Sequence, residues 1–229
     1  MIARLSFLAL LLSVPAVQAA TAPAALKPPA DRHIRVAVVL TEGATMIDFA
    51  GPWEVFQDVH VPERGKTMDE QMPFELFTVG ASKDPIETSG GMTVVPQYTF
   101  ADAPVPDVVV VGAQRGAPEL SAWLRQMRGK ARIVMSVCTG AFKLAEAGLL
   151  DGKPATTHHD FYEPFAERYP KVTLVRSKRY VQADDVVFTG GGLSSGIDLA
   201  LHVVELYFGR EAAERTARYM EYQGDGWKN

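Results

Sequence analysis

Three almost uninterrupted apolar runs constrain the fold of this chain more than any other feature. They are residues 34–40 (Ile-Arg-Val-Ala-Val-Val-Leu), 108–111 (Val-Val-Val-Val) and 132–137 (Arg-Ile-Val-Met-Ser-Val). Each is rich in β-branched residues and lacks the polar alternation of a half-exposed strand. Such runs are typical of strands that are buried on both faces, as in parallel sheets covered by helices.

Helix-compatible segments separate these runs. We expect helices in residues 47–56, 118–127, 139–145, 161–169, 194–208 and 211–222, and the regular part of the first should begin near Pro52. Shorter strands are expected at residues 74–79, 155–158, 173–175, 180–183 and 186–189, with an antiparallel hairpin at 86–98. The alternation of strand and helix predicts right-handed βαβ units, and therefore an α/β fold with a doubly wound, mostly parallel, flavodoxin-like sheet and helices on both faces.

The N-terminus has the pattern of a secretory signal peptide. A positive charge at Arg4 precedes a short apolar block at residues 5–12, and Val17-Gln18-Ala19 presents small residues at the spacing that a signal peptidase accepts. We therefore predict a signal peptide over residues 1–19 and a periplasmic or secreted protein. The apolar block is too short for a permanent anchor, so no stable membrane insertion is expected after cleavage. The Ala- and Pro-rich residues 20–33 predict a flexible leader.

Composition indicates one globular domain over residues 34–229. The apolar content of 47% supports a substantial core, and a net charge of −4 without a basic cluster argues against nucleic acid as a partner. The single cysteine cannot form an internal disulfide, so the core must hold the fold.

That cysteine, Cys138, lies where the third apolar run meets a helix-compatible run. A residue between a strand end and a helix start sits on a sharp turn, as in a nucleophile elbow. The unpaired N–H groups and the dipole of the helix favour an anion there, so we expect the thiol to ionise more readily than a free cysteine. Cys138 is therefore a candidate nucleophile. The alternative is a buried cysteine that packs as a small apolar residue.

Other polar groups are expected at the same edge of the sheet, because ligands bind outside the carboxyl ends of parallel strands. Asp48 follows the first run and Gly112-Ala113 the second. The N–H groups of Ala113 and Thr139 are candidate donors to an oxyanion, and Gly112 would permit close approach of the chain. Asp48 is either a carboxyl partner of Cys138 or a helix N-cap.

The sequence His158-His159-Asp160 contains metal-ligating residue types. Adjacent residues on an extended chain point to opposite faces, so we predict no metal site, which leaves one of the two histidines free to face Cys138. Gly190-Gly191-Gly192 lacks the Gly-x-Gly-x-x-Gly spacing of a dinucleotide site and predicts a tight strand-to-helix turn. No cofactor is expected.

Taken together, the motifs resemble the ThiJ/PfpI family of the class I glutamine amidotransferase-like superfamily over about residues 34–222. The family's acidic residue, five positions after a glycine in the first strand-to-helix loop, matches Asp48 counted from Gly43. Its elbow cysteine matches Cys138 in Ser-Val-Cys-Thr-Gly, and the histidine of its Thr-Thr-His motif matches His158.

Details of these motifs point to one branch of the family. Asp rather than Glu at the acidic position, in Asp-Phe-Ala-Gly-Pro, is similar to isocyanide hydratases, and so is Cys-Thr-Gly-Ala-Phe. Both motifs are equally similar to the sensor domains of AraC-type transcription regulators, which carry a C-terminal helix-turn-helix for which we expect no room before Asn229. Thr139 stands where peptidase-like members have His, and Ala113 replaces a Gly that is usual in many members.

The resemblance implies a small-molecule substrate and a homodimer. In the hydratase mechanism that it implies, the Cys138 thiolate attacks an isocyanide, Asp48 supplies a proton, and water releases an N-substituted formamide, while the N–H groups of Thr139 and Ala113 hold the developing charge. Two alternatives stay open. One is a non-catalytic, ligand-binding or thiol-sensing periplasmic protein, and the other is a glyoxalase- or deglycase-like activity on reactive aldehydes.

Overall fold

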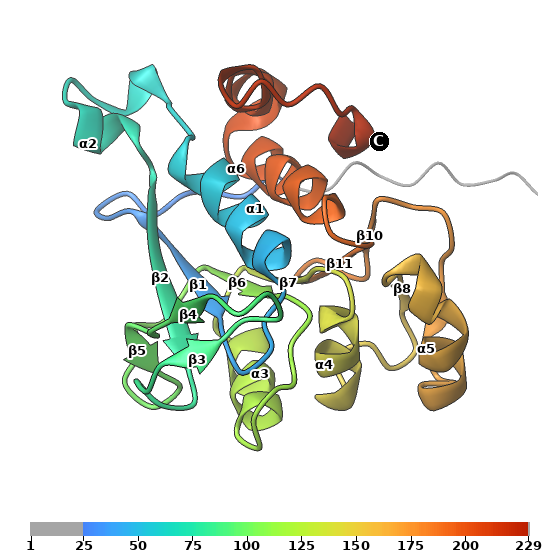
Figure 1. Ribbon diagram of the computed structural model, residues 1–229. Helices are drawn as coiled ribbons and strands as arrows, with labels where there is room; N and C mark the ends of the chain where they lie inside the picture. The colour runs from blue at the N-terminus through green and yellow to red at the C-terminus, as the bar shows by residue number, and fades with distance from the viewer. Residues whose placement is uncertain (1–24, 229) are drawn as a thin grey trace, which may run out of the picture.

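The computed structural model describes residues 25–228 (Figure 1). The predicted signal peptide and the first residues of the predicted leader, up to residue 24, lie outside the described residues. Among those that are described, no helix combines the length and the apolar character that a membrane crossing requires.

A seven-stranded sheet forms the centre of the domain. Its strands lie in the order β10 (Tyr180–Gln182), β11 (Val187–Gly190), β7 (Ile133–Ser136), β6 (Val108–Val111), β1 (Ile34–Val39), β2 (Phe74–Gly80) and β5 (Tyr98–Thr99). All neighbours are parallel except β10 and β11. Every residue of β6, β7 and β11 is buried, as their uninterrupted apolar character predicts. The predicted α/β fold class is confirmed.

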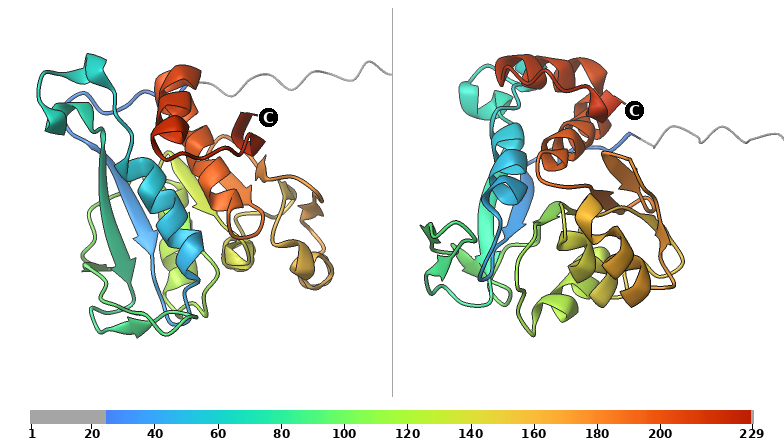
Figure 2. Two further views of the ribbon diagram at one scale, coloured as in Figure 1. Left: turned by 45° about the horizontal axis from the view of Figure 1, so that its top comes forward. Right: turned by 45° about the vertical axis from the view of Figure 1, so that its right-hand side comes forward.

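Helices cover both faces of the sheet (Figures 1 and 2). Helices α1 (Met46–Gln57) and α6 (Ser195–Tyr219) pack on one face over a first apolar cluster. Helices α3 (Leu120–Arg128), α4 (Gly140–Glu146) and α5 (Tyr162–Arg168) enclose a second cluster on the other face. The remaining elements are short: α2 (Met68–Gln71), η1 (Pro62–Arg64), η2 (His159–Phe161), η3 (Gly226–Lys228), and the strand pairs β3 (Ile86–Glu87) with β4 (Thr93–Val94) and β8 (Pro154–Ala155) with β9 (Thr173–Leu174).

Several predicted boundaries were wrong, each for a local reason. Helix α1 already begins at Met46 and accommodates Pro52 in its interior. The hairpin ends at Val94, since Tyr98 joins the main sheet beside β2. The predicted strand at 155–158 stops at Ala155, because the chain turns there into η2. The two predicted C-terminal helices form one element that is interrupted at Gly209, whose φ of 80° is not helical.

Part of the predicted leader contacts the domain. The Leu26 N–H donates to the Leu206 carbonyl at 2.8 Å, and the Leu26 side chain packs on the first apolar cluster. The Arg32 guanidinium binds both carboxylate oxygens of Asp107, at 2.6 and 3.1 Å. The Ala- and Pro-rich composition of the predicted leader did not indicate these contacts. They hold the last residues before β1 against the sheet.

Candidate active site

Cys138 lies on a sharp turn between β7 and α4. Its φ of 58° is in the left-handed region that non-glycine residues rarely adopt, as in a nucleophile elbow. Its N–H donates to the Gly191 carbonyl at 2.7 Å, and its carbonyl accepts the Thr157 hydroxyl at 2.9 Å. A Cβ on Gly140 would overlap the Val111 carbonyl, so glycine is needed for α4 to start this close to β6. The Cys138 residue is 6% exposed.

Asp48 reaches the thiol from the first turn of α1. It is completely buried, its Oδ2 accepts the Ala113 N–H at 2.9 Å, and its Oδ1 has no hydrogen-bond partner among the described residues. The carboxylate lies close enough to the Cys138 thiol for each group to shift the pKa of the other. The N-cap of α1 is Thr45, so the N-cap alternative for Asp48 was wrong. A Cβ on Gly112 would lie 2.7 Å from the Asp48 Cβ, which confirms that Gly112 permits close approach. The structure thus places Asp48 beside Cys138, which agrees with the carboxyl-partner alternative and with the family resemblance.

Burial governs the protonation of this pair. It raises the pKa of Asp48 to about 6, although hydrogen bonds from the Ala113 N–H and the Cys138 thiol oppose the rise. Burial, followed by the negative charge of Asp48, also raises the pKa of Cys138 to about 11. The expected acidic thiol was therefore wrong, because these two effects outweigh the N–H groups at the turn. The resting site holds a neutral thiol beside a buried carboxylate that readily accepts a proton.

Two backbone N–H groups, those of Thr139 and Leu193, face the sulfur and lower the pKa of the thiol. The Thr139 N–H was predicted as a hydrogen-bond donor to an anion. Ala113 was also predicted, but its N–H already donates to Asp48 and is not available to a substrate anion while that bond is in place. Leu193 was missed. Its φ of 49° follows Gly190-Gly191-Gly192, and this glycine run was the only sequence signal for an unusual turn there.

His158 lies beside this turn. It is the N-cap residue of η2, where its Nδ1 accepts the Asp160 N–H at 3.2 Å. A Cβ on Gly192 would overlap the His158 ring, so the ring and the glycine backbone are in direct contact. His158 is not among the groups that shift the pKa of Cys138. The structure therefore places His158 against the wall of the site, where it supports the turn.

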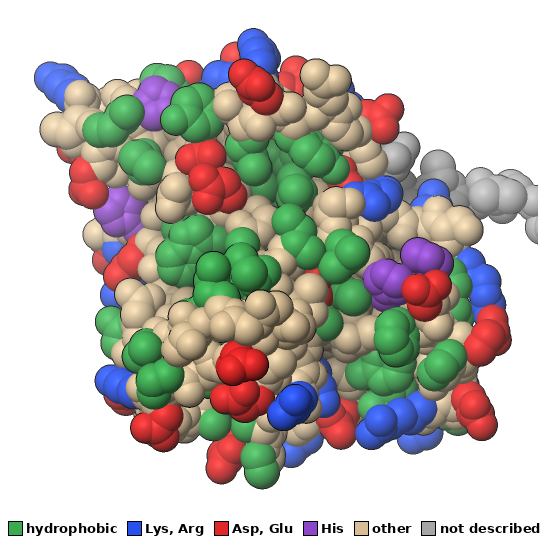
Figure 3. Space-filling view, viewed as in Figure 1, with side chains coloured by type: hydrophobic (Ala, Val, Ile, Leu, Met, Phe, Trp, Pro, Cys, Tyr) green, Lys and Arg blue, Asp and Glu red, His purple; other side chains and the backbone are tan. Residues whose placement is uncertain are grey.

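The expectation that His158 and His159 point to opposite faces was wrong. Their rings stack with centroids 4.5 Å apart, because the chain is not extended at this point but turns into η2. One donor atom from each histidine and one from Asp160 lie within 4.8 Å of one another, and histidine and acidic side chains gather on this surface in Figure 3. Side chains of His159 and Asp160 are mostly exposed, and His158 Nδ1 already accepts a backbone N–H. We assign no metal to them.

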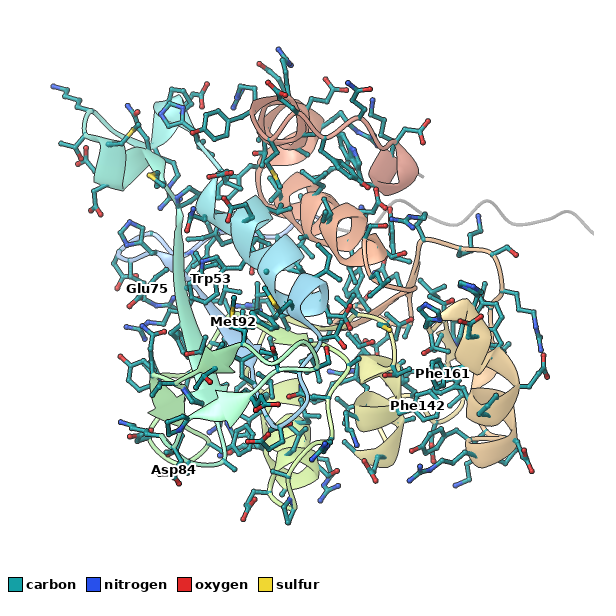
Figure 4. All side chains as sticks on the ribbon, viewed as in Figure 1. Trp53, Glu75, Asp84, Met92, Phe142 and Phe161 are labelled. Atoms are coloured by element: carbon teal, nitrogen blue, oxygen red, sulfur yellow. The ribbon has the colours of Figure 1, made fainter. Side chains whose placement is uncertain are left out.

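A cavity of about 400 Å³ adjoins the elbow and is lined in part by Thr157, Gly191 and Leu193, the residues that contact Cys138. Leu193 is 43% exposed there. Beyond His158, Phe161 makes an edge contact with Phe142 across 6.4 Å, and Figure 4 shows the two rings between α4 and α5. Most of the side chains that line the cavity are polar, and Leu193 is the aliphatic residue among them.

Comparison with known proteins agrees with this geometry. The profile of the DJ-1/PfpI family matches residues 34–206. Isonitrile hydratase from Pseudomonas putida is 30% identical over 195 residues, which cover 82% of this chain and 78% of the hydratase. The HTH-type transcriptional regulator GbdR from Pseudomonas aeruginosa is 26% identical over 86% of this chain, which spans only 53% of the regulator.

Solved structures show the same fold. The crystal structure of a ThiJ/PfpI family protein from Pseudomonas syringae is 26% identical and superposes with a TM-score of 0.70, covering 95% of this chain and 83% of that protein. An AraC family transcriptional regulator from Pseudomonas putida superposes with a TM-score of 0.68 at 21% identity, covering 82% of this chain and 99% of that structure. The fold is thus shared with a ThiJ/PfpI family protein and with a protein described as a transcriptional regulator.

Proposed function

Because this chain belongs to the DJ-1/PfpI family, we propose that it is a cysteine-dependent enzyme that hydrates an isocyanide to an N-substituted formamide. The observation that carries the proposal is the buried Asp48 carboxylate, with a pKa raised to about 6, which lies beside the Cys138 thiol on an elbow. The similarity to isonitrile hydratase supports it. Isocyanide hydration needs a nucleophile and a proton carrier at one carbon, and this pair supplies both.

In the first stage the Cys138 sulfur attacks the terminal carbon of R–NC. As the S–C bond forms, the thiol proton moves to Asp48, whose raised pKa suits it to accept and return a proton. Asp48 then delivers that proton to the same carbon, which gives a thioimidate, R–N=CH–S–Cys. The N–H groups of Thr139 and Leu193 stabilise the negative charge on sulfur while the S–H bond breaks.

In the second stage water adds to the thioimidate carbon. Asp48 takes one proton from the water and passes it to the nitrogen, which gives R–NH–CH(OH)–S–Cys. The C–S bond then breaks, and the hydroxyl proton returns through Asp48 to the sulfur. The products are R–NH–CHO and the original thiol, so the cycle consumes one isocyanide and one water and needs no cofactor.

A direct assay tests the proposal. Purified protein should convert a simple alkyl isocyanide to its formamide, which the formyl proton reports by NMR. Cys138→Ala should abolish turnover, and Asp48→Asn should slow it by about a hundredfold or more, because the proton carrier is lost. Asp151→Asn, which changes an exposed carboxylate, is the matched control and should keep full activity. Absence of formamide, or equal rates with and without the Cys138 thiol, would refute the hydratase proposal.

A second candidate is a ligand-binding or thiol-sensing protein without turnover. It is favoured by the neutral, 6% exposed thiol and by the similarity to the regulator GbdR. Stoichiometric oxidation of Cys138 by dilute peroxide, with no turnover of isocyanides or of α-oxoaldehydes, would support it. Formation of lactate from methylglyoxal would instead identify the glyoxalase-like alternative, since the same thiol can attack an aldehyde carbon.

Export and dimerisation also belong to the proposal. The signal-peptide pattern supports the proposal that the protein is exported to the periplasm or outside the cell. Exposed apolar side chains lie at the start of α1, Met46 and Ile47, and on either side of β4, Met92 and Val95. They offer a surface that a second copy of the chain would cover. Figure 4 shows Met92 in front of β4, on the side of the domain that carries Trp53 of α1.

A further inference from the structure

We propose that an ion pair between Arg179 and Asp198, covered by the C-terminal segment 222–228, positions the Leu193 N–H against the Cys138 sulfur. Asp198 and the segment lie outside the site described so far, whereas Arg179 is part of the lining of the cavity beside the elbow. The inference rests on Cys138 as the reacting group and does not depend on which substrate the thiol attacks.

The first connection runs through the backbone. Cys138 donates its N–H to the Gly191 carbonyl at 2.7 Å, and Gly191 donates its own N–H to the Arg179 carbonyl at 2.9 Å. Arg179 is the residue before β10, whose first residue pairs with Gly190. The beginning of the Gly191–Ser194 turn is therefore fixed between the elbow and the main chain of Arg179.

The second connection runs through the Arg179 side chain. Its Nε donates to Asp198 Oδ2 at 2.6 Å, and its Nη2 donates to the Ser194 hydroxyl at 3.1 Å. Asp198 lies in the first turn of α6 and is only 1% exposed. Ser194 directly follows Leu193, so Arg179 holds both ends of the turn, one with its carbonyl and the other with its guanidinium.

The C-terminal segment completes the arrangement. The Tyr222 hydroxyl donates to Asp198 Oδ1 at 3.1 Å, which leaves both carboxylate oxygens hydrogen-bonded. A Cβ on Gly226 would lie 2.7 Å from Arg179 Cγ, so the backbone of the segment passes directly over the ion pair. Trp227 is 1% exposed and anchors the segment, which Figure 2 shows folded back beside α6. Asp198 is therefore shielded from water, whereas the Arg179 side chain remains 40% exposed.

Leu193 needs such support because its φ of 49° is unfavourable for a leucine. Relaxation of this residue toward ordinary backbone angles would rotate its N–H away from the sulfur. With the turn held at Gly191 and at Ser194, the N–H stays directed at Cys138. Arg179, Asp198 and Tyr222 are thus positioning residues, and their loss should destabilise the thiolate.

The test uses the full protein with a single ¹³C-labelled cysteine, whose Cβ shift reports thiolate formation. Asp198→Asn should lower the thiolate fraction at pH 9.5 by about threefold or more, as expected when an N–H bond to sulfur is weakened. Tyr222→Phe should have a smaller effect in the same direction. Asp107→Asn is the matched control, because it breaks the ion pair with Arg32 far from the turn, and its titration should coincide with that of the parent protein.

Alkylation of Cys138 by iodoacetamide provides a second readout, and it should slow in parallel with the thiolate fraction. A titration of Asp198→Asn and of Tyr222→Phe that coincides with that of Asp107→Asn would overturn the proposal. Faster alkylation with an unchanged Cβ titration would also overturn it, because the ion pair would then merely shield the thiol. Neither readout requires turnover, so failure of the hydratase assay leaves this test intact.

Discussion

Replacement of Asp48 by Asn should stabilise the protein while it removes the proton carrier. The pKa of Asp48 is raised from 3.8 to about 6, chiefly because the carboxylate is completely buried. Between these two values the folded protein binds more protons than the unfolded chain, so its stability falls as pH rises through this range. The free-energy cost of burying the ionised carboxylate is absent below pH 3.8, and it is fully present above pH 6.

The size of the penalty follows from the shift. A shift of about two pKa units corresponds to about 3 kcal/mol, which is a large fraction of the stability of a typical domain. At pH 7.5 Asp48→Asn should therefore gain up to about 3 kcal/mol, or about 6 to 12 °C in Tm for a domain of this size. At pH 4 the gain should nearly vanish, because Asp48 is protonated in the folded protein. The amide oxygen can still accept the Ala113 N–H.

Urea unfolding of the two proteins at pH 4, 5, 6 and 7.5 measures this difference. Asp151→Asn, which changes an exposed carboxylate, should show no such dependence on pH. Asp48→Asn should also lower the pKa of the Cys138 thiol, since the charge of Asp48 adds to the effect of burial in raising it. A stability gain that is equal at pH 4 and pH 7.5, or a loss at pH 7.5, would refute the argument that burial destabilises the carboxylate.

Two further predictions concern packing and assembly. Gly192→Ala should lose about 1 to 3 kcal/mol in urea unfolding because the new methyl group overlaps the His158 ring, whereas Gly129→Ala, at a helix end with open space, should be neutral or slightly stabilising. Ile47→Glu should convert the proposed homodimer to a monomer in sedimentation equilibrium, whereas Met68→Glu, equally polar but on α2, should leave the mass unchanged. A monomeric parent protein would contradict the dimer.

The sheet was predictable because its strands are locally unambiguous. Residues 108–111 are four valines, and no other element suits such a run in a chain of this length. Because Asp48 and Cys138 each follow one of these strands, the sequence also predicted that both lie at the carboxyl edge of the sheet. Element ends were less predictable. Pro52 suggested a helix start, yet tertiary packing of α1 on α6 extends the helix back to Met46.

The parts of the site that the sequence missed depend on contacts between distant segments. Nothing local marks Leu193 as a donor to sulfur, because its N–H is placed by the turn that follows three glycines. The raised pKa of Cys138 was also missed. A helix N-terminus favours the thiolate, but the sequence does not show how deeply the sulfur is buried or how close the charge of Asp48 lies.

Around Cys138, some positions accept no other residue because a glycine is tightly packed there, whereas others can be substituted. Gly112, Gly140 and Gly192 each face a neighbour that leaves no room for a methyl group, so any exchange there disturbs the elbow or its partner. Leu193, by contrast, lines the cavity beside the elbow and is 43% exposed. A mutant library aimed at a new substrate range should therefore randomise this side chain and keep the glycines fixed. Natural drift in specificity should follow the same division.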